Sequence, residues 1–75
     1  MSKLPLLNAK EVTKILEKLG FTVLRQQGSH MFFSHPDGRT TVIPNHGGEE
    51  IDRGLLNKII KKDLQISREE FLNEL

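Results

Sequence analysis

Apolar residues in the N-terminal part of the chain recur at the spacing of a helix. They lie three or four positions apart and so share one side of the helix: Val12, Ile15, Leu16 and Leu19. Asn8 followed three positions later by Glu11 resembles a capping box at the start of this run, and Gly20 suits the left-handed position after its end. We therefore predict a first helix that begins after Asn8 and ends near Gly20.

The middle of the chain has the composition of short β-strands separated by turns. Residues 21–27 are rich in β-forming residues, Gly-Ser at 28–29 can turn the chain, and residues 30–35 form a second strand. Residues 36–39 have the composition of a tight turn, which returns residues 40–44 as a third strand. The prediction is a meander of three antiparallel strands.

The C-terminal part of the sequence returns to helical spacing. Asp52 can cap a second helix, which carries four apolar residues on one face: Leu55, Leu56, Ile59 and Ile60. Ser67 and Glu70 form a capping box for a short final helix with three apolar residues: Phe71, Leu72 and Leu75. Helices on one face of an antiparallel sheet make a two-layer α+β domain, and this element order is that of the double-stranded-RNA-binding fold.

Length and composition limit the class of protein. The 75 residues suffice for one core, so we predict a single domain over residues 1–75, and 36% hydrophobic with 28% charged residues indicates a globular chain. The absence of cysteine excludes a disulfide framework and a thiolate metal site. The N-terminal apolar stretch is too short, and too broken by Pro5, for a signal peptide or a membrane span. We expect a cytoplasmic protein with no membrane association.

Charge is unevenly distributed along the chain, although the net charge is only +1. Residues 1–48 carry six Lys or Arg against three Asp or Glu, and the acidic excess lies in residues 49–75. Lys10, Lys14 and Lys18, which we call the lysine stripe, recur every fourth residue opposite the apolar side of the first helix. Such a stripe can contact RNA phosphates, but it is equally typical of a helix face that is simply solvated.

Three histidines are the candidates for chemistry: His30, His35 and His46. His30 and His35 lie five apart in one predicted strand, so their side chains should point to opposite faces, and a shared metal ion is not expected. Ser29 is expected to form the turn and not to serve as a nucleophile beside His30. Phe32 and Phe33 can stack on a base, but we predict core packing for both.

His30 follows the Gly-Ser turn at the exposed start of a strand, a position that suits catalysis. RNA carries its own nucleophile, the 2′-hydroxyl, so one well-placed base is sufficient and no metal or other cofactor is required. An imidazole with an ordinary pKa of ~6.5 can take up a proton at neutral pH. The alternative is a partly buried histidine that only hydrogen-bonds a neighbour, and the spacing alone does not decide between them.

The chain resembles the HicA toxin family, also called YcfA-like proteins, from about Asn8 to Phe71. Five short motifs carry the resemblance: Gly28-Ser29-His30, His35-Pro36, Pro44-Asn45-His46, Leu19-Gly20-Phe21, and Ile66 with Glu69-Glu70-Phe71. The chain departs from the family at Asn8-Ala9-Lys10, where Ser-Gly-Lys is frequent, and at Arg53-Gly54-Leu55, where Gly-Thr-Leu is frequent. Neither departure falls on the Gly-Ser-His triplet.

This resemblance implies a double-stranded-RNA-binding-like fold, ribosome-independent cleavage of mRNA, growth arrest, and neutralisation by a HicB antitoxin. It implies that His30 is the catalytic residue. Gly28, Ser29 and the lysine stripe are candidate RNA contacts. A non-catalytic RNA-binding module of the same fold remains the alternative function.

Overall fold

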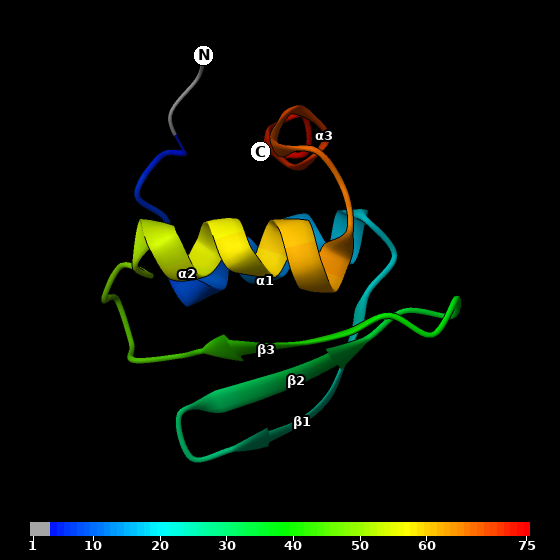
Figure 1. Cartoon of the computed structure of the whole chain (residues 1–75). Coiled ribbons are helices and arrows are strands. Elements are labelled where there is room, and N and C mark those ends of the chain that lie inside the picture. Colours follow the sequence, from blue (N-terminus) through cyan, green and yellow to red (C-terminus); the bar gives the residue numbers. More distant parts are fainter. Residues whose placement is uncertain (1–3) are drawn as a thin grey trace.

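The computed structural model describes residues 4–75, and it arranges a three-stranded sheet beneath a layer of helices (Figure 1). The predicted domain, 1–75, includes residues 1–3, which lie outside the described part. The elements are α1 Ala9–Lys18, β1 Thr22–Gln27, β2 His30–Ser34, β3 Thr40–Pro44, α2 Arg53–Lys58, the π-helix η1 Ile59–Leu64 and α3 Arg68–Leu72. The α+β order predicted from the sequence is therefore confirmed.

The sheet is a simple antiparallel meander in the order β1-β2-β3. In Figure 1 the helices α1 and α2 lie on one side of the sheet and α3 lies beyond them. No helix of residues 4–75 covers the opposite side, which we call the open side of the sheet. Burial is therefore expected on one side of each strand only, and the structure has this pattern in β2 and β3.

The hydrophobic core lies between the helices and the covered side of the sheet. The sheet contributes Phe33 and Ile43 to it, and the buried Thr41 lies beside them in β3. The rest of the core comes from the helices and the segments between elements: Leu4, Leu7, Ala9, Val12, Ile15, Leu16, Phe21, Ile51, Leu56, Ile59, Ile60, Leu64 and Phe71. Phe21 was predicted to begin the first strand, but it lies just before β1 and packs in this core.

The helix ends follow the predicted capping residues. The Asn8 side chain accepts from the Glu11 N–H at 2.9 Å, and the Glu11 carboxylate accepts from the Asn8 N–H at 2.9 Å. Asp52 caps α2 by accepting from the Leu55 N–H at 3.1 Å. These bonds satisfy backbone donors that the first turn of a helix leaves unpaired, so the helix starts are determined locally.

A π-helical segment, which the sequence pattern did not indicate, continues α2. Its wider turn lets Ile59, Ile60 and Leu64 all face the core, and it ends at Gln65 in the left-handed conformation, φ 57°. The sheet is tied to this segment because Thr41 Oγ1 donates to Asp63 Oδ2 at 2.8 Å. The π-helix thus fixes the sheet against the helical layer.

The turn between β2 and β3 forms a small polar cluster at the far end of the sheet. Asp37 accepts from the backbone N–H of Arg39 at 3.0 Å and from its Nε at 2.8 Å. These bonds hold the pKa of Asp37 below its ordinary value, with the backbone N–H as the largest cause. The Arg39 guanidinium also donates to the Leu64 carbonyl at the end of η1. The turn is therefore anchored to the helical layer.

His35 belongs to this cluster and not to the strand in which it was predicted. Its Nδ1 lies 3.0 Å from Asp37 Oδ1, and its ring packs edge-on against Phe21 with 5.0 Å between ring centroids. The ring also lies against Gly20, which has a φ of 97°. A Cβ added at Gly20 would lie 2.9 Å from His35 Nε2.

We predict that Gly20→Ala destabilises the protein, because the new methyl group meets His35 and the backbone has a positive φ. The free energy of unfolding should fall by about 1–3 kcal/mol, which lowers the melting temperature by ~4–8 °C for each kcal/mol. Gly48→Ala is the control, because Gly48 has no positive φ and its Cβ would meet no atom within 4 Å. Equal melting temperatures for the two variants would contradict the prediction.

Candidate active site

His30 is the first residue of β2 and lies directly after the hairpin turn. Gly28 in that turn has a φ of 58°, a left-handed conformation that favours glycine. The Ser29 carbonyl accepts from the Asn45 N–H at 2.6 Å, which ties the turn to the segment after β3. The His30 backbone is paired with strands on both sides, whereas its side chain is exposed. The imidazole is thus held on a fixed backbone and open to a ligand.

Strand alternation places the His30 side chain on the open side of the sheet. Its register partners are Gln27 on β1 and Pro44 on β3, whereas the adjacent pair, Met31 and Ile43, points toward the helices. Nine residues of the sheet register lie on the open side, and we call them the open face: Thr22, Arg25, Gln27, His30, Phe32, Ser34, Thr40, Val42 and Pro44. In β1 a register shift between Val23 and Arg25 interrupts the alternation, so Thr22 and Arg25 share this side although they are three positions apart.

Arg25 and Phe32 form a cation–π pair on the open face. The guanidinium carbon of Arg25 lies 4.3 Å from the centroid of the Phe32 ring. The prediction that both Phe32 and Phe33 pack in the core is wrong for Phe32, because the strand alternation that buries Phe33 turns Phe32 outward. Arg25 did not stand out in the sequence, because the register shift between Val23 and Arg25 that turns its side chain to the open face breaks the regular alternation of β1.

The lysine stripe lies on the other side of the sheet, where its three members have different surroundings. Lys10 and Lys14 line a hollow of about 510 Å³ together with five other residues: Thr13, Glu17, Met31, Asn45 and Gly47. The Thr13 hydroxyl is buried and has no hydrogen-bond partner among residues 4–75. Lys18 instead donates from Nζ to the Glu74 carbonyl at 3.2 Å.

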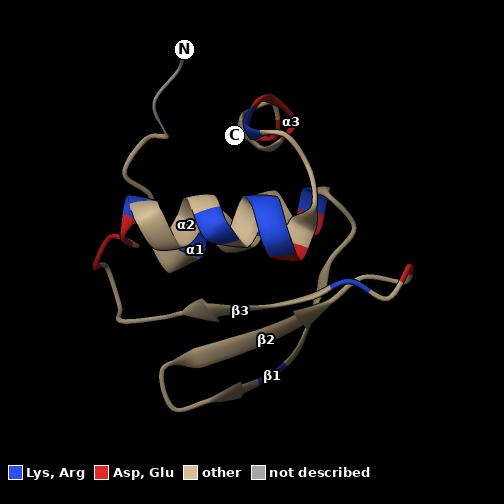
Figure 2. Cartoon of the chain, in the orientation of Figure 1, with Lys and Arg blue, Asp and Glu red and all other residues tan. Residues whose placement is uncertain are grey.

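The lysine hollow and His30 therefore occupy the same end of the fold but open on opposite sides of the sheet. Met31 follows His30 in the chain and points toward the helices, where it lines the hollow. Asn45 also lines the hollow, and its backbone holds the turn before His30. Figure 2 agrees with this division, because Lys and Arg are prominent on the helical layer and sparse in the strands.

A family model described as the HicA toxin of bacterial toxin–antitoxin systems matches residues 9–66. This chain belongs to the HicA toxin family. Its role is accordingly that of the toxin in a toxin–antitoxin pair. The matched segment contains α1, the whole sheet, α2 and η1, and it includes the Gly28-Ser29-His30 triplet. No curated protein matches the chain.

The other two histidines of this HicA-family toxin lie apart from the open face. His35 packs in the turn cluster described above, and His46 is exposed in the loop after β3. Within residues 4–75, no three His, Cys, Asp or Glu side chains come together in a group that could hold a metal ion. Residues 4–75 also form no helix that is long and apolar enough to cross a membrane.

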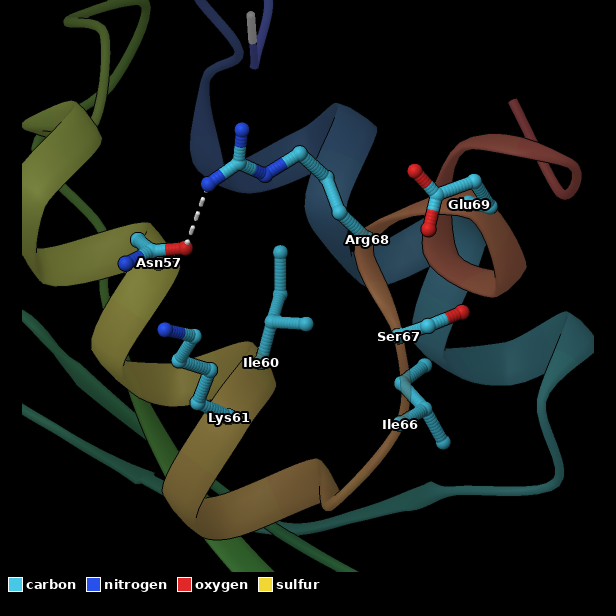
Figure 3. A pocket seen from close by; sticks show the side chains of 7 residues that line it. All are labelled: Asn57, Ile60, Lys61, Ile66, Ser67, Arg68 and Glu69. Carbon is cyan, nitrogen blue, oxygen red and sulfur yellow. Dashed lines mark hydrogen bonds between the residues drawn. The ribbon is translucent and has the colours of Figure 1, made fainter. Parts of the chain in front are cut away.

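A further hollow of the HicA-family toxin, about 300 Å³ in volume, lies between η1 and the start of α3 (Figure 3). Arg68 crosses its rim and donates from Nη2 to Asn57 Oδ1 at 3.2 Å. Its lining comes from residues 57–69 alone, so it shares no side chain with the open face or with the lysine hollow. The surface around His30 is therefore built by the sheet, apart from this hollow.

Proposed function

We propose that this HicA-family toxin is an endoribonuclease that cuts mRNA without the ribosome, with His30 as its catalytic base. The observation that carries the proposal is the position of His30, an exposed imidazole on a doubly paired strand, facing the open side of the sheet. A fixed backbone and an accessible ring nitrogen are what a general base needs to reach a substrate proton. The turn residues Gly28 and Ser29 directly precede His30 and would contact RNA bound at its side chain.

The reaction uses a nucleophile that RNA supplies. His30 removes the proton of a 2′-hydroxyl, and the 2′-oxygen forms a bond to the neighbouring phosphorus. The bond from phosphorus to the 5′-oxygen breaks, and this oxygen takes a proton from water. The products are a 2′,3′-cyclic phosphate and a 5′-hydroxyl, and His30 then returns its proton to the solvent. Neither a metal ion nor a covalent enzyme intermediate takes part.

Phosphates that flank the cut site bind in the lysine hollow. Lys10 and Lys14 supply positive charge there for contacts with phosphate oxygens. Because this hollow and His30 open on opposite sides of the sheet, the RNA strand has to bend around the end formed by the hairpin turn and Asn45. A flexible single strand can make this bend, whereas a continuous duplex is too stiff.

We predict that His30→Ala lowers the rate of RNA cleavage by at least ~10²-fold, the usual loss for a general base. The exposed side chain makes little packing contact, so the free energy of unfolding should change by no more than ~0.5 kcal/mol. A short RNA with 2′-deoxyribose at the cut site should resist the wild-type protein, because the nucleophile is absent. His46→Ala is the control and should cut normally. Cleavage by His30→Ala at the wild-type rate would exclude the mechanism.

A second prediction concerns the dependence of RNA binding on salt. Each phosphate that the protein neutralises on a single strand adds roughly 0.7 to the slope of log affinity against log salt. Lys10→Gln combined with Lys14→Gln should therefore flatten the slope by about 1.4, measured by fluorescence anisotropy with an RNA that cannot be cut. Lys61→Gln combined with Lys62→Gln removes the same charge from η1. The slope of this control should stay steeper than that of the variant with Lys10→Gln and Lys14→Gln. Equal slopes would remove the lysine hollow from the RNA path.

We also propose that a HicB-type antitoxin neutralises the toxin by covering the open face. An interface of standard size takes about 800 Å² from each partner, and the chain exposes 4727 Å² in all. Such an interface would span the sheet and hide His30. Val42, which is 38% exposed, together with the outward edge of Phe32, offers apolar area for the centre of the contact.

Co-expression with the antitoxin should restore growth and yield a complex that does not cut RNA. In that complex, diethyl pyrocarbonate should fail to modify His30, because the antitoxin covers it, whereas Lys61 and Lys62 on the helical side should stay reactive. Peptide mass spectrometry of the free and bound toxin reads out both sites. A complex in which His30 reacts as fast as in the free toxin would show that the antitoxin binds elsewhere.

A further inference from the structure

Cleavage by one histidine leaves a second chemical need unmet. When the 2′-oxygen attacks, negative charge builds on the oxygens of the scissile phosphate, and a preorganised cation beside them stabilises this charge. The base holds the proton taken from the 2′-hydroxyl at this stage and lies beside the attacking 2′-oxygen. It therefore cannot also stabilise the charge on the phosphate oxygens. This need for a cation rests on the function proposed above.

Arg25 is the only Lys or Arg in the three strands, and it lies on the same open face as His30. The other arginines near the sheet are already engaged, since Arg39 binds Asp37 and the Leu64 carbonyl and Arg53 donates to the Leu4 carbonyl. The lysines that line the hollow open on the opposite side of the sheet. Position alone therefore selects Arg25.

The register places Arg25 at a suitable distance from His30. Arg25 faces Phe32, and His30 is two residues before Phe32 on the same strand, so the two side chains are diagonal neighbours. Diagonal neighbours on one face of a sheet lie roughly 7–8 Å apart. A phosphate fits between an imidazole and a guanidinium at that separation, because the long arginine side chain can extend toward it.

The cation–π contact with Phe32 restrains the Arg25 guanidinium where it can bind a phosphate. The guanidinium carbon lies 4.3 Å from the centroid of the ring, and this contact restrains the group. A guanidinium offers a planar pair of N–H donors that can bind two phosphate oxygens. None of the nine residues of the open face carries a negative charge, so nothing on this surface repels the phosphate.

We propose that the RNA strand crosses the open face of the sheet and that Arg25 is a second catalytic residue, which binds the scissile phosphate and stabilises its developing charge. The open face then supplies both the base and the cation of the reaction. Phe32 keeps the guanidinium in position, and Val42 beside it provides an apolar surface for an adjacent nucleobase.

Single-turnover cleavage of a short RNA by saturating protein tests the role of Arg25. Arg25→Gln should lower the rate by ~10²-fold or more, the loss typical of one removed donor to a developing oxyanion. Arg25→Lys should retain part of the rate, because it keeps the charge but not the planar pair of donors. Lys62→Gln, which removes the same charge from η1, should cut normally. Melting curves of all variants show whether the fold is preserved.

A second measurement tests the path of the RNA and does not depend on cleavage. Val42 and Leu55 are almost equally exposed, at 38% and 40%, but Val42 lies on the open face and Leu55 on α2. The RNA for this test carries a 2′-O-methyl group at the cut site, so it binds but is not cut. Val42→Glu should weaken its binding by about tenfold or more, similar to the cost of one mismatched contact in a nucleic-acid interface. Leu55→Glu should leave the binding unchanged. Equal affinities would overturn the open-face path.

The outcomes separate this proposal from the function on which it rests. If the wild-type protein and His30→Ala both fail to cut RNA, the ribonuclease function fails and the role of Arg25 falls with it. If the wild type cuts, His30→Ala does not, and Arg25→Gln cuts at the wild-type rate, the function stands and Arg25 is not catalytic. If Arg25→Gln does not fold, a wild-type rate for a folded Arg25→Lys with unchanged salt dependence would overturn the need for a guanidinium.

Discussion

Coverage of the sheet on one side only is the constraint on which the rest of this structure depends. The helices bury Phe33, Thr41 and Ile43, and because successive side chains of a strand alternate, their neighbours must face away from the helices. His30 and Phe32 are such neighbours. A shift of one residue in the register of β2 would exchange the two sets, exposing Phe33 and burying His30. The packing of the core therefore also determines which side chains are open to a ligand.

The covered side is kept in register by polar contacts as well as by apolar packing. Thr41 binds Asp63, and Arg39 binds the end of η1, so the sheet meets the helical layer in a specific arrangement. A hydroxyl and a guanidinium with defined partners favour one register, because any slip would leave these buried or partly buried groups without hydrogen bonds. The position of His30 follows from contacts that are distant from it along the chain.

The sheet also separates two kinds of surface. The open face combines an imidazole, an aromatic ring and one arginine, whereas the lysine hollow lies on the helical side at the same end of the fold. Under the proposed function, a single RNA strand that bends around this end would meet both surfaces, and a protein on the open face would block one of them without contacting the other. The proposed cleavage and the proposed phosphate binding would thus depend on different sets of residues.

Local sequence determined the elements of this protein, and tertiary structure decided which surfaces became available. Capping boxes at Asn8 and Ser67, helical spacing and turn residues act within a few positions, so the element order and the exposed start of β2 at His30 could be predicted. The π-helix, the contact of Lys18 with the Glu74 carbonyl and the outward position of Phe32 could not, because they depend on packing between distant segments. Alternation alone says that Phe32 and Phe33 face opposite ways, but only the helices over the sheet decide which of the two is buried.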